Sequence, residues 1–185
     1  CVFEWRLGHL TKKANAMLAG LGRTRRILVS DTLLLDHSDD EIEVILAHEL
    51  AHLVHRDTWT SLALQVVTLV TACRVAAGVL PRAADALGLT GPADLAALPL
   101  LVLVGGGVAA IARPCAHALS RWQEVRADRF ALEVTRNPDA FMSSVRRLGA
   151  QNLADERPPR LVQILCATHP SVTERVASAR AWAAG

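Results

Sequence analysis

The sequence predicts an α+β fold that is mainly helical, and three observations support this prediction. The first thirty residues hold short β-branched segments between glycine turns, which predicts a small N-terminal sheet. Two capping boxes, at 38–41 and 171–174, each introduce a stretch with helical periodicity. Between them lie two long apolar runs, which predict a hydrophobic helical hairpin. At 185 residues we expect one domain, 1–185, with the hairpin at 58–112 inserted in it.

The N-terminal segments predict about three strands. Val2 to Leu7 is a mixed candidate, and Asn15 to Leu18 runs into the turn Gly20-Leu21-Gly22. Ile27 to Ser30 is apolar and β-branched, and it ends before Asp31-Thr32.

A helix is predicted to start near residue 39 and to continue past 55. Ser38 takes the N-cap position and Glu41 the N3 position of a capping box, and the helix dipole favours acids in this first turn. A broad apolar face follows, formed by Ile42, Ile45, Leu46, Leu50, Leu53 and Val54.

The central segment contains the two apolar runs. Residues 58–73 carry no charge, and the apolar character resumes after Arg74. Residues 95–112 form an uncharged stretch of 18, interrupted by Pro99 and by Gly105-Gly106-Gly107. Each run is at the lower edge of the length that spans a bilayer. Two interpretations stay open, a pair of membrane helices and a buried hairpin of a soluble core.

Charge placement favours the membrane. The loop 82–94 contains one Arg and two Asp, whereas the outer flanks carry Arg56, Arg113, Arg121 and Arg126. Positive flanks on one side predict that both polar parts of the chain lie in the cytoplasm. Apolar residues make up 51% of the chain and aromatic ones only 4%, which suits lipid-facing or closely packed helices.

Helices dominate the C-terminal part. Arg121 to Thr135 is predicted as a helix that ends before Pro138, and Pro138 to Gly149 as a short helix that begins with proline. Residues 152–160 are predicted to form a polar, proline-rich loop. Ser171 to Ala184 is predicted as a terminal helix with Glu174 at N3.

Composition limits the possible partners. The 20 basic and 18 acidic residues give a net charge of +2, so no nucleic-acid partner is expected. The cysteines at 1, 73, 115 and 166 have no short pairing, which argues against a zinc-thiolate site and a secreted disulfide framework. Because the chain begins at Cys1 and not at Met, we expect it to be part of a longer protein. The sequence predicts no oligomeric state.

The segment His48-Glu49-Leu50-Ala51-His52 places two histidines one turn apart on one helical face. Their imidazole nitrogens can bind one Zn²⁺ at about 2.0–2.1 Å. Glu49 is placed to take a proton from a water that the metal activates for attack on a peptide carbonyl. The alternative is a polar helix face with coincidental spacing. We predict His48 and His52 as metal ligands and Glu49 as the general base.

A catalytic zinc needs a third protein ligand and one open position. His55 lies roughly 10 Å along the helix axis from His48, so a surface or core role is expected for it. Glu124 and Asp128 form an i, i+4 acid pair on another predicted helix, where one could bind metal and the other orient a ligand histidine. From spacing alone, an equal alternative is a solvated acid pair flanked by Arg121, Arg126 and Arg129.

Several segments carry a likeness to a known family: Asn15-Ala16, Gly20-Leu21-Gly22-Arg23-Thr24-Arg25-Arg26-Ile27, Asp31-Thr32-Leu33-Leu34, Leu46-Ala47-His48-Glu49-Leu50-Ala51-His52, Glu124-Val125-Arg126-Ala127-Asp128, Thr168-His169-Pro170 and Glu174-Arg175. On these motifs the chain resembles the HtpX and CAAX prenyl endopeptidase family of membrane zinc metalloproteases. The likeness covers most of the chain outside the two apolar runs.

The resemblance implies a zincin-like fold, one zinc per chain and a protein or peptide substrate. It implies that His48, His52 and Glu124 hold zinc, that Glu49 is the base and that Asp128 orients a ligand. It also implies that the two apolar runs are helices in a lipid bilayer between the two halves of the site. With the positive flanks described above, we expect the zinc site to face the cytoplasm.

The resemblance assigns roles to two further pairs of residues. It places His169 and Arg175 near the substrate carbonyl, where they could stabilise the oxyanion. A plain helix cap is the alternative for His169. Asn15 and Ala16 resemble an edge segment to which an extended substrate adds as a strand. A simple turn-entry asparagine is the alternative there.

Two departures from the family concern the subtype. Ser120-Arg121 resembles a family dipeptide, but Trp122-Gln123 separates it from Glu124. The hairpin is short and glycine-rich, whereas CAAX processing needs a large intramembrane chamber built from further helices. We therefore assign no prenylated substrate.

Taken together, these motifs predict a zinc-dependent endopeptidase that acts on protein substrates at a membrane, in quality control or processing. Two interpretations remain beside it. One is a sensor module of the antirepressor metalloprotease kind, in which the histidine motif is also followed by an Arg-Asp pair like Arg56-Asp57. The other is a non-catalytic membrane scaffold with an inert zinc site. The intact Glu49 argues against the scaffold, because an inert site needs no base.

Overall fold

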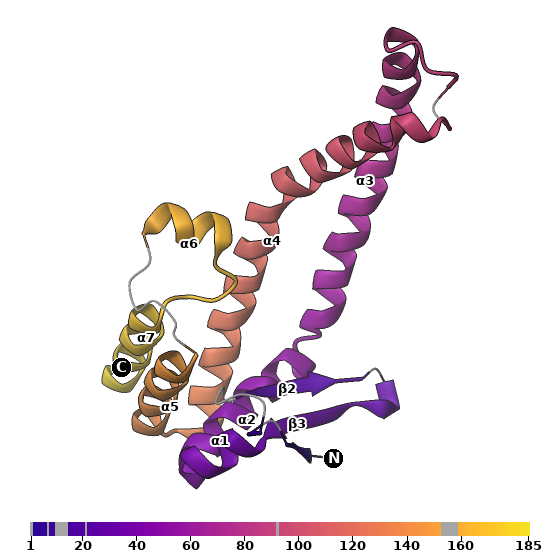
Figure 1. Cartoon of the computed structure of the whole chain (residues 1–185). Coiled ribbons are helices and arrows are strands. Elements are labelled where there is room, and N and C mark those ends of the chain that lie inside the picture. The colour runs from indigo at the N-terminus through magenta and orange to yellow at the C-terminus, as the bar shows by residue number, and fades with distance from the viewer. Residues whose placement is uncertain (1, 7, 10–14, 21, 92, 153–158) are drawn as a thin grey trace.

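The computed structural model describes residues 2–6, 8–9, 15–20, 22–91, 93–152 and 159–185. In this part of the chain, a small sheet and several short helices form a base from which two long helices extend (Figure 1). The mainly helical α+β fold class predicted from the sequence is confirmed.

The sheet contains β1 (Val2–Trp5), β2 (Ala16–Ala19) and β3 (Arg26–Ser30) in the order β1-β3-β2. β1 runs parallel to β3, and β2 runs antiparallel to it. These strands match the three predicted segments to within a few residues. The order leaves β2 at an edge of the described sheet, on the side where Asn15 and Ala16 lie. A short 3-10 turn, η1 (Gly22–Thr24), connects β2 to β3.

Helix α2 (Asp39–Val54) begins as predicted. The Ser38 hydroxyl accepts from the Glu41 N–H at 3.3 Å, and the Glu41 carboxylate accepts from the Ser38 N–H at 2.9 Å. A preceding helix, α1 (Asp31–Asp36), was not predicted. It forms because the Ser30 hydroxyl accepts from the Leu33 N–H at 3.2 Å, so the residue that ends β3 also caps α1.

The two long helices differ from the expected boundaries. α3 (Asp57–Ala86) continues through Pro81 and Arg82, so the connection at the tip is shorter than the predicted loop 82–94. After η2 (Leu95–Ala97), α4 (Leu98–Thr135) joins the second apolar run and the predicted helix 121–135 into one helix. The sequence places Pro114 inside α4, yet the helix does not end there. By helical rise, α3 is about 45 Å long and α4 about 57 Å.

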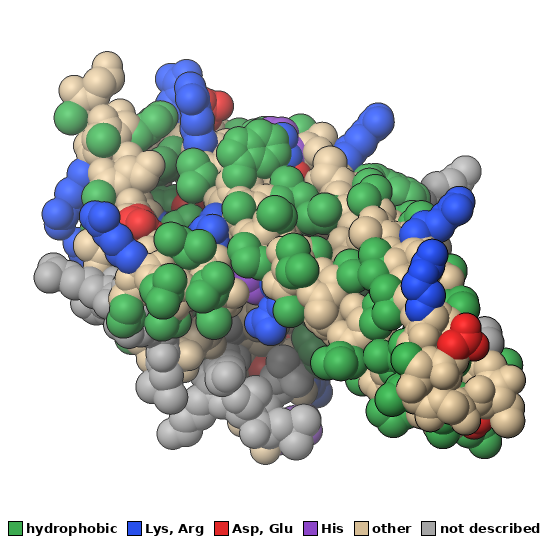
Figure 2. Space-filling model, turned by 90° about the horizontal axis from the view of Figure 1, so that it is seen from above, with side chains coloured by type: hydrophobic (Ala, Val, Ile, Leu, Met, Phe, Trp, Pro, Cys, Tyr) green, Lys and Arg blue, Asp and Glu red, His purple; other side chains and the backbone are tan. Residues whose placement is uncertain are grey.

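Most of the apolar surface of this hairpin is exposed. α3 and the segment 95–135 are both long and apolar enough to cross a membrane, and the most apolar window of each is only 6% buried. Seen from above, the molecule shows hydrophobic side chains over much of its surface, interspersed with basic side chains (Figure 2). Ala76, Leu80 and Ala97 form the buried apolar contact that closes the tip. Within the described residues, neither helix is packed as a soluble core helix would be.

The remaining helices are α5 (Pro138–Gln151), α6 (Arg160–Cys166) and α7 (Val172–Ala184). α5 and α7 were predicted, whereas α6 was not. Most of the predicted loop 152–160 lies outside the described residues. The main core joins α2, α4, α5 and α7 through Val44, Ala47, Ala131, Leu132, Ala140, Phe141, Val145, Val176 and Ala179.

A second apolar cluster packs the sheet and α1 against the other side of α2, through Val29, Leu33 and Ile45. Helix α2 is therefore held between the sheet and the C-terminal helices. This position fixes the helix that carries the histidine motif.

Candidate active site

Helix α2 presents His48 and His52 one turn apart. Their rings lie edge to face, with centroids 5.0 Å apart. In the same helix Val44, Ala47 and Ala51 are buried, and Val44 and Ala47 belong to the main core. Because α2 packs on both sides, the two imidazoles have a fixed direction toward α4.

Glu124 on α4 meets both histidines. Its Oε2 lies 3.3 Å from His48 Nε2, and its Oε1 lies 3.5 Å from His52 Nε2. The candidate ligand atoms of these three residues all lie within 4.8 Å of one another. The structure thus brings together the predicted ligand set from helices that are far apart in the sequence.

The donor chemistry of this group fits Zn²⁺, which in catalytic sites takes three protein ligands from His and Glu. The fit is supported by what faces the other ring nitrogens. His48 Nδ1 lies 2.9 Å from Asp128 Oδ1, and His52 Nδ1 lies 2.8 Å from Asp57 Oδ2. A carboxylate at each Nδ1 leaves each Nε2 directed at Glu124, where a metal would be shared.

The charges of the site are strongly coupled. Burial alone would lower the pKa of His48, but the facing carboxylates of Asp128 and Glu124 raise it to about 9. The next group is Glu124, which lies on α4 outside the apolar run 95–112. Burial alone would raise its pKa, yet His169 and His48 hold that pKa well below the usual range for a carboxyl. A metal held at His48 would have to displace its proton, so its affinity would fall as pH falls.

Asp128 also binds Arg175 from α7. The guanidinium donates from Nε to Oδ2 at 2.8 Å and from Nη2 to Oδ1 at 2.5 Å. Burial would raise the pKa of Asp128, and the Arg175 charge with the His48 contact lowers it instead. The predicted orienting residue is thus itself oriented by a residue that was predicted to contact substrate.

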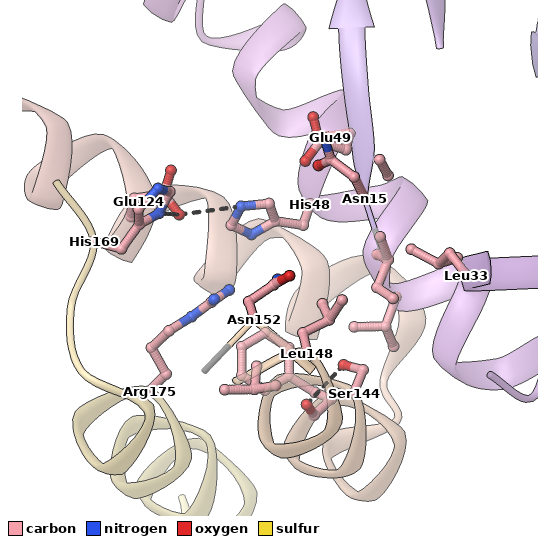
Figure 3. Close-up of a pocket in the computed structure, with 15 residues that line it drawn as sticks. Asn15, Leu33, His48, Glu49, Glu124, Ser144, Leu148, Asn152, His169 and Arg175 are labelled. Atoms are coloured by element: carbon pink, nitrogen blue, oxygen red, sulfur yellow. Dashed lines mark hydrogen bonds and ion pairs between the residues drawn. The ribbon is translucent and has the colours of Figure 1, made fainter. Parts of the chain in front are cut away.

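His169 lies on the segment between α6 and α7. Its Nδ1 is 2.9 Å from Glu124 Oε2, and its side chain is 62% exposed. The imidazole therefore reaches the candidate metal group from the solvent side. It lies next to Glu124 in Figure 3, with Arg175 below.

Glu49 faces a cavity beside the histidines. It lies next to Asn15 at the sheet edge, across His48 from Glu124 and His169 (Figure 3). The carboxyl is partly buried, and this desolvation raises its pKa, although the histidines oppose the shift. A raised pKa brings a carboxyl nearer to the range in which it exchanges protons efficiently at neutral pH.

The cavity has a volume of about 140 Å³ and combines polar and apolar walls. The polar wall carries the predicted residues, and the apolar wall comes from α1, α2 and α5. Its lining includes Asn15, Ala16, Leu33, His48, Glu49, Glu124, Phe141, Ser144, Val145, Leu148, Asn152, His169 and Arg175. The structure thus places Asn15 and Ala16 at the same cavity as Glu49.

Some residues of the site were not predicted. Asp57 contacts His52, although the sequence pointed to it only through the likeness of Arg56-Asp57 to sensor-type proteases. The apolar wall from α5 was not predicted either, because residues 138–149 were predicted only as a short helix that begins with proline. His55 lies outside the group, because its ring packs edge to face against Phe130 with centroids 5.8 Å apart.

A helix with the His-Glu-x-x-His motif that meets a glutamate from a second helix defines the site of a metalloprotease. The family model described as "Peptidase family M48" matches residues 4–183, and the chain belongs to this family. The resemblance stated from the motifs is therefore confirmed.

Named relatives agree with this assignment. The chain is 33% identical over 179 residues to the "Uncharacterized metalloprotease YhfN" of Bacillus subtilis, covering 95% of this chain and 42% of that one. It is 30% identical over 174 residues to a "Protease HtpX homolog" of Neisseria meningitidis, covering 88% and 61%. The chain thus spans about half the length of these relatives.

A solved structure shows the same fold. The crystal structure of S. mikatae Ste24p superposes with a TM-score of 0.80 at 19% identity, over 96% of this chain and 44% of that one. At this identity the likeness establishes the fold and leaves the chemistry to the residues described above.

Proposed function

We propose that this chain forms the catalytic part of a zinc-dependent endopeptidase that hydrolyses protein substrates at the cytoplasmic face of a membrane. The observation that carries the proposal is the convergence of His48, His52 and Glu124 beside Glu49 at one cavity. Two histidines and a glutamate leave a fourth position open for catalysis, as a structural zinc site does not.

His48 Nε2, His52 Nε2 and a Glu124 oxygen would hold one Zn²⁺ per chain. When bound, zinc lowers the pKa of a water and polarises the substrate carbonyl. Asp128 faces His48 Nδ1 and fixes the direction of its ring. These residues therefore position the metal and leave the proton transfers to Glu49.

Glu49 acts as the general base and then as the general acid. Its carboxylate takes a proton from the attacking water as the new C–O bond forms. The same proton then passes to the amide nitrogen as the C–N bond breaks, which restores the carboxylate. The partial burial that raises the pKa of Glu49 supports both steps.

His169 and Arg175 would stabilise the negative charge that develops on the carbonyl oxygen. Both line the cavity, and the Arg175 guanidinium is held in place by its two bonds to Asp128. Fixed donors of this kind are effective because they need no reorganisation during the reaction.

The substrate would lie extended along β2. Edge strand β2 follows Asn15, and both Asn15 and Ala16 line the cavity. An extended peptide would add to this edge as a further strand. One of the side chains that flank the scissile bond would then point toward the apolar wall formed by Leu33, Val145 and Leu148. We therefore expect cleavage next to an apolar residue of modest size.

The hairpin 58–112 would be inserted in the bilayer within a single metalloprotease domain, 1–185. The exposed apolar windows of α3 and α4 support this placement. Helix α6, which packs beside α4, exposes Leu161, Val162, Ile164 and Leu165 as well. Arginines at the outer flanks favour a cytoplasmic site.

Two measurements test this proposal. Purified protein should bind about one zinc per chain and cleave an unfolded test protein, with activity lost to a chelator and restored by Zn²⁺. Cleavage that persists after the metal is removed would contradict the zinc chemistry. Release of the protein from membranes as a monodisperse species without detergent would contradict the bilayer placement and leave the zinc chemistry standing.

A further inference from the structure

Asp57 is a buried acid that none of the proposed catalytic steps uses. It is the first residue of α3, and its side chain is 6% exposed. Its Oδ2 lies 2.8 Å from His52 Nδ1, and its Oδ1 accepts from Arg126 Nη2 on α4. The carboxylate therefore connects the helix of the metal motif with both helices of the hairpin.

The backbone between α2 and α3 directs Asp57 toward His52. Arg56 adopts the left-handed region at φ 58°, which is uncommon for a residue with a Cβ. This turn ends α2 and starts α3 at once, so Asp57 folds back toward the last turn of α2. A strained conformation of this kind persists when surrounding contacts determine it.

Helix α4 supplies those contacts. Gln123 Nε2 donates to Thr60 Oγ1 at 2.7 Å and to the Asp57 carbonyl at 3.4 Å. The Arg126 guanidinium lies 4.3 Å from the centre of the Trp122 ring. The start of α3 is thus held by Gln123 and Arg126, which flank the third candidate ligand, Glu124, in the sequence.

From this geometry we propose that Asp57 is a positioning residue for His52, and the proposal rests on the proposed metal site. Asp57 accepts the Nδ1–H of His52, which keeps the Nε2 lone pair directed at the metal. Asp128 does the same for His48, so each ligand histidine has its own carboxylate. Because Asp57 is the first residue of α3, the start of the hairpin contributes directly to the affinity for the metal.

The alternative role for Asp57 is a plain ion pair with Arg126 that only stabilises the fold. The two roles differ in what Asp57→Ala, Asp57→Asn and Arg126→Gln do to metal binding. If Asp57 positions His52, Asp57→Ala should weaken zinc affinity roughly 10–100-fold, and Arg126→Gln should weaken it much less. The zinc affinity of Asp57→Asn should lie between those of the parent and Asp57→Ala, because the asparagine amide oxygen can still accept from the His52 Nδ1–H.

The experiment measures zinc affinity of the purified protein by chelator competition, together with the visible absorption of the Co²⁺-loaded protein. Asp39→Asn is the matched control, since Asp39 is also the first residue of its helix but is exposed. We expect an altered cobalt spectrum for Asp57→Ala and none for Asp39→Asn. If Asp57→Ala does not fold, Asp57→Asn decides by the same readouts.

Zinc affinity and a cobalt spectrum equal to those of the parent in the Asp57 variants would overturn the positioning role. Equal losses of zinc affinity in Asp57→Ala and Arg126→Gln would also overturn the positioning role, in favour of the plain ion pair. A parent protein that binds no zinc would instead contradict the proposed function itself, so the two failures are distinguishable.

Discussion

Arg175 on α7 donates two hydrogen bonds to the carboxylate of Asp128 on α4, at 2.8 and 2.5 Å. Asp128 in turn faces His48 Nδ1 at 2.9 Å. The C-terminal helix therefore reaches the candidate metal site through one carboxylate. Arg175 thus holds Asp128 and also lines the cavity beside Glu49.

Replacing Arg175 should affect stability and activity together. Arg175→Ala leaves the Asp128 carboxylate buried and without its guanidinium, which should cost about 3 kcal/mol of unfolding free energy. Arg175→Lys keeps the charge but cannot donate in the same two-bonded geometry, so it should recover only part of the loss. Chemical denaturation of the metal-free protein measures the first effect and peptidase assays the second.

Arg180→Ala is the control for this prediction, because Arg180 is an exposed arginine on the same helix. It should leave stability and activity near those of the parent. An Arg175→Ala protein as stable as Arg180→Ala would show that the Asp128 contact carries little energy.

Local patterns made much of this architecture predictable. The capping box at Ser38 and Glu41 and the i, i+4 spacing of His48 and His52 are properties of one helix, and a single helix can be inferred from its own sequence. Glu124 could be placed only through the family resemblance, since spacing alone did not distinguish a ligand from a solvated acid. The structure settles its place among the histidines by packing α4 against α2.

Other features depend on contacts that no local pattern encodes. Asp57 reaches His52 because Arg56 takes a left-handed conformation, and arginine is not a residue that signals such a turn. Helix α4 runs through Pro114, although proline usually predicts a break. Helix α6 has only seven residues and none of them is buried, so it lacks the periodic core face that predicts a helix.

Glu124, and not His55, should complete the metal site. Glu124→Ala removes a ligand and should weaken zinc sharply, whereas His55→Ala should keep about one zinc per chain, because the His55 ring packs on Phe130. Metal analysis after dialysis against a weak chelator compares the two. Zinc retained by Glu124→Ala but lost from His55→Ala would reverse the assignment.

The charge of Glu41 should make stability depend on pH. Glu41 is buried, and although desolvation opposes it, hydrogen bonds from Ser143 and the Ser38 N–H and the Arg147 charge lower its pKa below the ordinary 4.5. A lowered pKa stabilises the fold above the unfolded value, and the gain is lost as pH falls through the folded pKa. Glu41→Gln keeps the capping box but not the charge.

The parent should therefore exceed Glu41→Gln in unfolding free energy by about 1–2 kcal/mol at neutral pH, and the difference should shrink below the ordinary carboxyl pKa. Melting curves across that pH range measure it. Glu43→Gln, an exposed change on the same helix, should show no such trend. A gap that stays constant with pH would rule out the charge as its source.

Leu148 should limit the size of the side chain accepted beside the scissile bond. Leu148→Ala enlarges the apolar wall of the cavity, so cleavage should shift toward larger apolar residues with metal content unchanged. Sequencing of products from a mixed peptide library gives the preference. Identical cleavage sites in both proteins would mean that the substrate side chain does not enter this cavity.

The most direct test of the account is the Glu49→Gln protein, assayed in parallel for zinc and for peptidase activity. Glutamine keeps the size of the side chain and its place beside His48 but cannot take a proton. We predict about one zinc per chain, as in the parent, and a loss of activity by orders of magnitude. A Glu49→Gln protein that binds zinc and is as active as the parent would contradict the proposed mechanism.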